Sequence, residues 1–193
     1  MRIFVAGATG VIGRRIVSLL AARGHDVAGM TRSAQNTAAL HALGAEPVVC
    51  DVFDAARLAE VIIGFAPDLV VHQLTDLPDD VGRIREAGGA NARIRREGTR
   101  NLLAAAAPAG VDRVLAQSVA WTIPGDGGAA VAEMERMVLG AGGVVLRYGQ
   151  FYGEGTYHPT EPPPAPRIHV DVAAARTVES LDEPSGIVTI TDS

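Results

Sequence analysis

Three glycines recur at intervals of three residues near the start of the chain, at Gly7, Gly10 and Gly13. The apolar run 2–6 before them predicts a buried strand, and residues 11–23 after them predict a helix. Gly7 permits a tight turn, Gly10 lets backbone amides approach a pyrophosphate, and Gly13 lets the helix pack close to the strand. The helix N-terminus adds free N–H groups and a positive dipole end. The spacing therefore predicts a dinucleotide-binding turn; the alternative is a glycine-rich turn that binds nothing.

The end of the second predicted strand, residues 26–30, indicates which dinucleotide would fit. A site for NAD needs a carboxylate there to accept hydrogen bonds from the ribose 2′-hydroxyl. This chain has Thr31, Arg32 and Ser33 instead. A guanidinium makes paired, charge-assisted hydrogen bonds to phosphate. Arg32, helped by Thr31 or Ser33, therefore predicts NADP(H) in preference to NAD(H); the alternative is a solvated surface arginine.

Asp51 and Val52 follow the third predicted strand, residues 46–50. Asp51 could accept a hydrogen bond from the adenine amino group, or it could cap the following helix, and the sequence leaves both interpretations open. The predicted cofactor-binding residues are Gly7, Thr9, Gly10, Val11, Ile12, Gly13, Thr31, Arg32, Asp51, Val52, Gln73 and Leu74.

Predicted strands and helices alternate along the whole chain. The strands are residues 2–6, 26–30, 46–50, 68–72, 113–117, 144–147 and 186–191, and the helices are residues 11–23, 34–43, 55–63, 91–107, 129–139 and 170–181. This alternation predicts an α/β fold, a Rossmann-type doubly wound parallel sheet of about seven strands with helices on both faces. We expect one domain over residues 1–193, with about 148–193 helping to form a substrate pocket. Two segments, 74–89 and the proline-rich 149–167, are expected to be loops that rim the site.

Composition excludes several classes of protein. With 48% apolar and 20% charged residues, the chain is not disordered, and a net charge of −5 argues against a general nucleic-acid binder. The single cysteine forms no internal disulfide, and no run approaches the ~18–20 apolar residues of a membrane span. The five histidines show no metal-ligand spacing. We expect a cytoplasmic protein with no metal, nucleic-acid or membrane partner.

Several further motifs join the glycine turn in order along the chain. They are Gly7-Ala8-Thr9-Gly10-Val11-Ile12-Gly13, Asp51-Val52 and residues 68–72, 98–103, 114–118, 146–153 and 168–171. Together they resemble the extended and atypical short-chain dehydrogenase/reductase superfamily, in particular the NAD-dependent epimerase/dehydratase group. The resemblance implies a Rossmann-type fold, NAD(P) across the strand ends, and a substrate pocket built by the C-terminal segments.

The catalytic dyad of that superfamily is absent. The resemblance implies a Tyr-x-x-x-Lys pair, in which lysine lowers the pKa of the tyrosine and tyrosine exchanges a proton with the substrate. Aligning Glu135 with the superfamily's glutamate puts Gly127 and Val131 where tyrosine and lysine belong. Ser118 matches the position of the serine that orients the substrate oxygen. The superfamily's helical Asn-x-x-Gly-Thr is also altered, because Arg95 stands at the asparagine position; we interpret residues 93–100 as a solvated helix face.

Three explanations of the missing dyad remain open. Another group could donate the proton, and the candidates are Ser118, His72 and one of the tyrosines Tyr148, Tyr152 and Tyr157. His72 has a suitable pKa for acid–base work, but a histidine ending a buried strand could equally be a packed structural residue. Water could supply the proton while the cofactor supplies hydride. Or the chain could have abandoned redox chemistry. The predicted catalytic residues are Ser118, Tyr148 and His72.

Residues after the later strands are expected to line the substrate pocket. They are Thr75, Trp121, Gln150, Phe151 and Tyr152. Trp121 could stack on a ring substrate or simply pack under a loop. The leading hypothesis is an NADPH-dependent atypical reductase of a small, ketone-type carbonyl substrate, with secondary metabolism as its expected setting. The alternatives are a non-redox cyclisation, isomerisation or epimerisation enzyme and a non-catalytic NADP sensor. A homodimer through helices 91–107 and 129–139 is expected by analogy with the superfamily.

Overall fold

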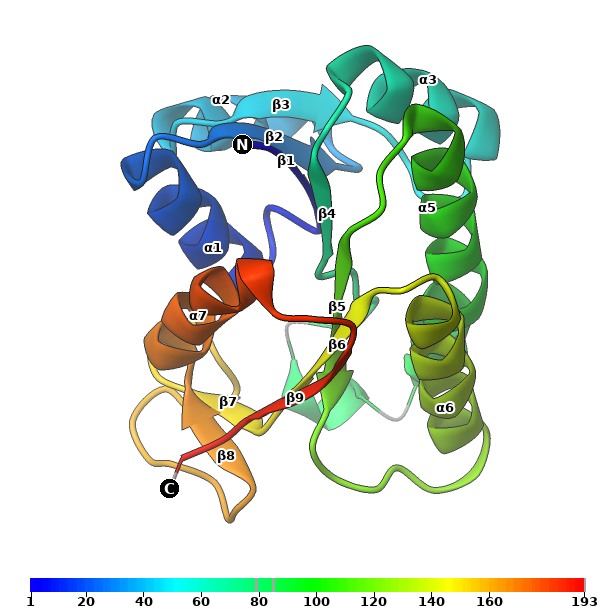
Figure 1. Ribbon diagram of the computed structural model, residues 1–193. Helices are drawn as coiled ribbons and strands as arrows, with labels where there is room; N and C mark the ends of the chain where they lie inside the picture. The colour runs from blue at the N-terminus through cyan, green and yellow to red at the C-terminus, as the bar shows by residue number, and fades with distance from the viewer. Residues whose placement is uncertain (79, 85, 193) are drawn as a thin grey trace.

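The computed structural model describes residues 1–78, 80–84 and 86–192, and it centres on a seven-stranded parallel sheet (Figure 1). The strand order is β3-β2-β1-β4-β5-β6-β9, and every neighbouring pair is parallel. The strands are β1 (Arg2–Ala6), β2 (Asp26–Thr31), β3 (Glu46–Val49), β4 (Leu69–His72), β5 (Val114–Val119), β6 (Val144–Tyr148) and β9 (Gly186–Ile190). The order reverses between β1 and β4, the point at which open α/β sheets bind their ligands. The predicted fold class is confirmed.

Helices cover both faces of this sheet (Figure 1). One face carries α1 (Val11–Ala22), α2 (Thr37–Ala42) and α7 (Val170–Glu179), and the other carries α3 (Ala55–Phe65), α5 (Thr99–Ala106) and α6 (Gly125–Gly140). A further helix, α4 (Gly88–Arg93), runs into α5 through a π-helical turn, η3 (Ile94–Gly98). Short 3-10 turns complete the list: η1 (Ala34–Asn36), η2 (Val81–Arg83), η4 (Ala107–Ala109) and η5 (Ser180–Asp182). No helix of the described residues is long and apolar enough to cross a membrane.

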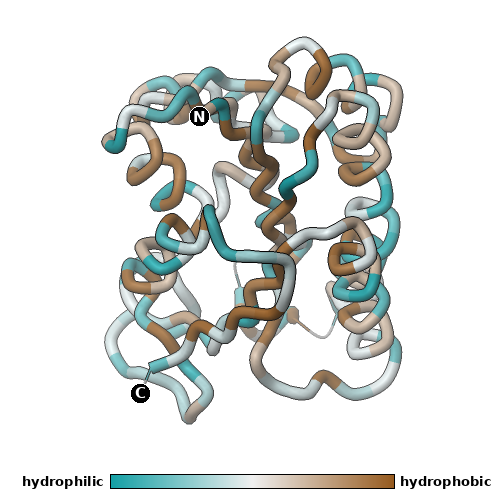
Figure 2. The backbone as a smooth tube through the Cα atoms, viewed as in Figure 1, coloured by the Kyte–Doolittle hydropathy of each residue, from teal (hydrophilic) through white to brown (hydrophobic). Residues whose placement is uncertain are grey.

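The alternation of side chains along β1 divides the core into two layers. Ile3 and Val5 pack against α1 and α7, whereas Phe4 and Ala6 pack against α3 and α5. All four side chains are fully buried, and the strands form the apolar centre of the molecule (Figure 2). Because both faces of the sheet are covered, its strands are apolar almost throughout, as parallel sheets require.

Arg15 joins helix α1 to segments from the last third of the chain. Its Nη1 donates to Val11 O at 2.8 Å, and its Nη2 donates to Glu154 O at 2.8 Å. Its Nε forms an ion pair with Asp171 at the start of α7. One side chain thus holds the first helix against both the 153–158 loop and α7.

Several segments differ from the sequence-based expectation. The predicted helix 129–139 begins earlier, at Gly125, and the predicted helix 34–43 opens as the 3-10 turn η1. The segment 149–167 is not all loop, because β7 (Gln150–Tyr152) begins it and pairs in parallel with β8 (Arg167–His169). Its prolines lie between the two short strands, where no ladder amide is needed. The predicted helix 91–107 begins earlier, at Gly88, and contains the π-helical turn. Such turns are frequent at functional sites.

Candidate functional site

A cavity of about 910 Å³ opens at the carboxyl ends of the central strands. Its walls come from the β1–α1 turn, the segments after β2, β4 and β5, the α4–η3 helix, and residues 148–158. The C-terminal part of the chain therefore contributes directly to the cavity. Most of the predicted cofactor and pocket residues line it: Gly7, Thr9, Gly10, Val11, Ile12, Thr31, Arg32, Val52, Gln73, Leu74, Thr75, Trp121, Gln150 and Phe151.

The β1–α1 turn places its three glycines in different environments. Gly7 has a φ of +86°, and a Cβ there would lie 2.7 Å from the backbone of Gln73. A Cβ on Gly13 would lie 2.1 Å from the carbonyl oxygen of Gly7, so this glycine serves close packing and does not line the cavity. Gly10 is the N-cap of α1, no side chain caps the helix there, and a Cβ would have its nearest neighbour at 3.4 Å. The first amides of α1 are therefore available to an anion.

Arg32 extends over the cavity from the end of β2. Its side chain is 55% exposed, and Nη2 pairs with Asp76 Oδ1 at 3.2 Å, a contact across to the segment after β4. Thr31 is buried, and its Oγ1 accepts hydrogen bonds from Ser33 N and Asn36 Nδ2. The guanidinium is thus positioned at the cavity but shared with a carboxylate.

Asp51 lies outside the cavity lining. Its Oδ1 accepts from Phe53 N at 2.9 Å, while Asp54 is the N-cap of α3 and accepts from Arg57 N at 3.0 Å. The interpretation of Asp51 as the cap of the following helix is therefore wrong, because the chain makes one further turn before the helix starts. Val52 does line the cavity.

The hydrogen bonding of Gln73 bears on whether the cavity suits a dinucleotide. The side chain is only 4% exposed and lines the cavity; its Nε2 donates to Tyr148 Oη at 3.3 Å. Its Oε1 has no hydrogen-bond partner among the residues that the structure describes. An unsatisfied buried acceptor costs about 1–3 kcal/mol, which a ligand hydroxyl would relieve. Together with the uncapped helix and the open space at Gly10, this acceptor makes the residues present suitable for a dinucleotide.

His72 is enclosed and fully hydrogen-bonded. The amide of Leu74 donates to Nδ1 at 3.2 Å, so Nε2 carries the proton and lies 2.9 Å from Thr99 Oγ1. Burial, reinforced by the charge of Arg95, lowers the pKa of His72 to about 3. The side chain does not line the cavity. This is the arrangement of a packed structural histidine.

Ser118 is fully buried and donates to Glu135 Oε1 at 2.5 Å. Arg147 holds the same carboxylate with two hydrogen bonds, from Nε at 2.9 Å and Nη2 at 2.6 Å. Burial alone would raise the pKa of Glu135, but the bonds from Arg147 and Ser118 outweigh it and lower that pKa. The Ser118 hydroxyl is therefore engaged with an ionised carboxylate, although the residue borders the cavity.

Tyr148 borders the cavity with its hydroxyl engaged inside the protein. Thr177 Oγ1 donates to Ala173 O, so Tyr148 Oη donates to Thr177 Oγ1 at 2.6 Å. Burial raises the pKa of Tyr148 to about 12. Tyr152 lies outside the cavity lining and donates to Asp192 Oδ2 at 3.1 Å.

His158 and Arg95 line the cavity but were not in the predicted site, and Tyr157, one of the candidate proton donors, lines it too. Tyr157 Oη donates to Pro78 O and so joins the two loops that border the cavity. His158 lines the cavity from the same loop. Arg95 is 5% exposed and lines the cavity, so the interpretation of 93–100 as a solvated face is wrong at this residue. Its only signal in the sequence was the departure from the superfamily's asparagine. Over residues 1–78, 80–84 and 86–192, no three His, Cys, Asp or Glu side chains group as metal ligands would.

The family follows from a direct match. Residues 3–137 match the model described as the NAD dependent epimerase/dehydratase family. The chain belongs to this family.

Relatives of the family member are named as reductases. A "3-diazoavenalumate denitrifying reductase" of a Streptomyces species is 34% identical over 235 aligned positions, which cover 100% of this chain and 76% of the relative. A farnesyl-dihydroquinoline-oxide ketoreductase of Stigmatella aurantiaca is 31% identical over 118 positions, 60% of this chain and 32% of the relative.

Solved structures of epimerases share the fold. UDP-glucose 4-epimerase of Thermus thermophilus, in complex with NAD, superposes with a TM-score of 0.80 at 22% identity, covering 99% of this chain and 78% of that one. A UDP-Glc/GlcNAc 4-epimerase of Campylobacter jejuni gives a TM-score of 0.82 at 15% identity, with 98% and 78% covered. These likenesses show that the chain shares the fold of those structures.

Proposed function

We propose that this family member is an NAD(P)H-dependent reductase of a small electrophilic substrate that works without a Tyr/Lys dyad. The observation that carries the proposal is the single cavity that joins the glycine turn to residues 148–158. One end of that cavity offers uncapped amides to a diphosphate, and the other has room for a substrate beside Trp121 and Phe151. The two relatives named as reductases support the reaction class.

The residues that would hold the dinucleotide are those of the β1–α1 turn, with Gln73 as a hydrogen-bond acceptor. When bound, the cofactor would supply a hydride. Arg32 supports a preference for NADP(H), because its guanidinium could exchange Asp76 for a 2′-phosphate. The carboxylate of Asp76 would keep Arg32 extended over the cavity until the phosphate arrives.

The residues predicted to be catalytic are poorly placed to donate a proton to a carbonyl substrate, so another donor is needed. On α6, Gly127 and Val131 occupy the dyad positions. Ser118, His72 and Tyr148 each hold their hydrogen in a bond within the protein. His158 lines the cavity, and its imidazole makes no hydrogen bond with any residue that the structure describes. We therefore assign the proton transfer to His158 or to cavity water.

The engagement of Ser118, His72 and Tyr148 within the protein also supports a second candidate substrate. In the reduction of an aryl diazonium group, the hydride supplied by NAD(P)H forms a C–H bond, the C–N bond breaks and N2 leaves. No alkoxide forms, so the step needs no group that protonates an oxygen. The streptomycete relative is named for a diazo substrate. A diazo compound is therefore the second class of acceptor to test beside ketones.

Turnover separates these functions from the alternatives. Purified protein is mixed with NADPH and a panel of aryl ketones and aryl diazo compounds, and loss of NADPH absorbance is followed together with product identity. A reductase consumes NADPH with one class of the panel and gives the reduced product in equal amount. Tight NADPH binding in calorimetry without consumption by any member would instead favour a non-redox enzyme or a sensor. For a ketone substrate, His158→Gln should lower kcat while leaving NADPH affinity unchanged.

A further inference from the structure

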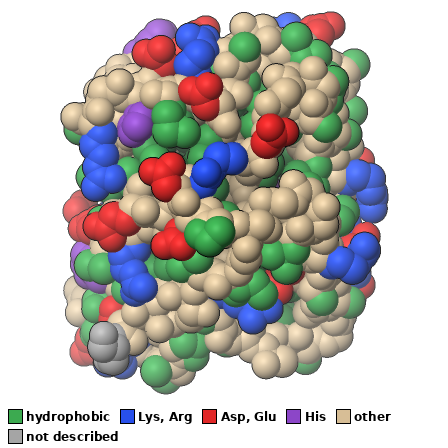
Figure 3. All heavy atoms as spheres, in the orientation of Figure 1, with side chains coloured by type: hydrophobic (Ala, Val, Ile, Leu, Met, Phe, Trp, Pro, Cys, Tyr) green, Lys and Arg blue, Asp and Glu red, His purple; other side chains and the backbone are tan. Residues whose placement is uncertain are grey.

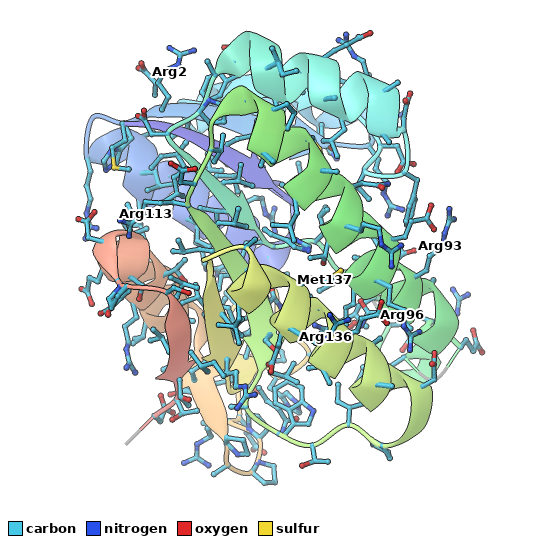
Figure 4. The ribbon with its side chains drawn as sticks, turned by 45° about the vertical axis from the view of Figure 1, so that its right-hand side comes forward. Arg2, Arg93, Arg96, Arg113, Arg136 and Met137 are labelled. Carbon is cyan, nitrogen blue, oxygen red and sulfur yellow. The ribbon has the colours of Figure 1, made fainter. Side chains whose placement is uncertain are left out.

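Arg95 is the one arginine of its helix that turns inward. On the same helix, Arg93 pairs with Glu97, and Arg96 pairs with Asp126 and Glu133. Figure 4 shows Arg93 and Arg96 on the outer side of the molecule. Arg95 lies in the π-helical turn, is nearly fully buried and lines the cavity.

The guanidinium of Arg95 forms no ion pair with any residue that the structure describes. Its one hydrogen bond among the described residues runs from Nη1 to Met134 Sδ at 3.6 Å, and a thioether is a weak acceptor. The carboxylate that attracts it, Glu135, is already held by two bonds from Arg147 and one from Ser118. Two guanidinium groups therefore share one carboxylate. Burial lowers the pKa of Arg95, in keeping with a cation that is poorly compensated.

The charged side chains among the described lining residues are arginines, although Arg32 is paired with Asp76 beside the cavity. None of its described lining residues is Asp or Glu, and its arginines are Arg32 and Arg95. The chain as a whole carries a net charge of −5, and acidic and basic side chains are interspersed over the face seen in Figure 3. A cavity without carboxylates in an acidic protein is suited to anions.

The two arginines serve different ends of the cavity. Arg32 follows β2, beside the glycine turn, where a dinucleotide phosphate would lie. Arg95 contacts Met134 on α6, and its charge acts on Glu135 and His72, beside the ends of β5 and β4. These elements form the half of the cavity that the dinucleotide turn does not occupy.

We propose that Arg95 binds a carboxylate of the substrate, so that this protein acts on a small organic acid. This inference rests on the proposed reductase function, because it takes the bound acid to be the substrate. Binding of the acid can nevertheless be measured without turnover. A guanidinium would meet the carboxylate with two parallel hydrogen bonds, and the bound anion would complete the charge balance of Arg95, Glu135 and Arg147.

The test compares two probes of equal shape, para-acetylbenzoate and the uncharged para-acetylbenzamide. Their affinities are measured by calorimetry and by the fluorescence of Trp121, the only tryptophan, which lines the cavity. We expect the wild-type protein to bind the benzoate on the order of 10- to 100-fold more tightly than the amide, as for a charged hydrogen bond. Arg95→Met, which keeps most of the side-chain volume, should remove this preference. The affinity for NADPH should not change, and the melting temperature should stay the same or rise. The matched control, Arg93→Met, should keep the preference.

Other outcomes overturn the inference in distinguishable ways. Equal binding of both probes to wild type, with NADPH bound normally, refutes the carboxylate site and leaves the proposed reductase standing. A preference that survives Arg95→Met assigns the anion to another group. Loss of NADPH affinity in Arg95→Met by the same factor would place Arg95 on the cofactor. Absence of NADPH binding by wild type, with the benzoate preference intact, refutes the proposed function and retains the anion site.

Discussion

The two ends of the cavity differ in whether their polar groups are hydrogen-bonded within the protein. At the β1–α1 turn, helix α1 has no side-chain cap and Gly10 leaves open space, so donors face outward for a ligand. At the β4, β5 and β6 ends, the groups expected to do chemistry are satisfied within the protein: Ser118 by Glu135, His72 by Thr99, Tyr148 by Thr177. The comparison contrasts a turn whose amides are open to a ligand with strand ends whose polar side chains bond to one another around one inward cation, Arg95.

Gly10→Glu should have the largest effect, because it places a side chain at the β1–α1 turn, the open half of the cavity. The nearest neighbour of a Cβ at this position is 3.4 Å away, so the chain should still fold, but the carboxylate would enter the space for the diphosphate. Like charges in contact cost several kcal/mol, and we expect dinucleotide affinity to fall roughly 100-fold or more in calorimetry. An unaltered melting temperature is the control. Unchanged affinity would remove the phosphate-binding assignment.

Glu135→Ala disrupts the hydrogen-bonded network at the β4, β5 and β6 ends, the closed half of the cavity. It leaves Arg147 and Arg95 without their shared carboxylate and Ser118 without its acceptor. Breaking a buried ion pair costs about 3–5 kcal/mol, and since Arg147 is 39% exposed we expect a loss of about 2–4 kcal/mol in the free energy of unfolding. Denaturant titration measures it. A loss below about 1 kcal/mol would mean that the network does not hold this end together.

Arg32→Ala sharpens the description of the open half by separating the two dinucleotides. If Arg32 takes the 2′-phosphate, NADPH should lose about 1.5–3 kcal/mol of binding energy while NADH changes little. Asp76→Asn is the matched variant, since it frees Arg32 from its ion pair and should strengthen NADPH binding. Equal losses for both dinucleotides would contradict the assignment to the 2′-phosphate.

His72 gives rise to a pH-dependent effect at the β4, β5 and β6 ends of the cavity. Its pKa falls from 6.5 to about 3 on folding, so between these values the unfolded chain binds a proton that the folded protein does not. Stability is therefore undiminished above about pH 6.5 and falls as the pH drops toward 3, by up to roughly 1.4 kcal/mol per pH unit. His72→Gln should flatten this slope relative to wild type in unfolding titrations between neutral pH and the acid limb. An identical slope in both proteins would show that His72 is not buried as a neutral group.

The sequence predicted what depends on local pattern. All seven strands of the main sheet and the glycine turn follow from apolar runs and glycine spacing, which act over a few residues. The partners of Ser118 and Tyr148 could not be predicted in this way, because Glu135 and Thr177 lie 17 and 29 residues farther along the chain. The inward direction of Arg95 was also hidden, since a π-helical turn changes the face on which later side chains fall and leaves no local signature.

The bonds of Arg15 have a consequence for exchanging parts between relatives. The family match ends at residue 137, yet the helix that would carry the diphosphate is anchored by Glu154 and Asp171. Its apolar face, with Ile16 and Leu20, is covered by α7. A chimera that transplants the first two-thirds of this chain onto another member must therefore import the closing third as well, or restore its acceptors for Arg15. The contacts of Arg15 thus make the first two-thirds of the chain structurally dependent on the last third.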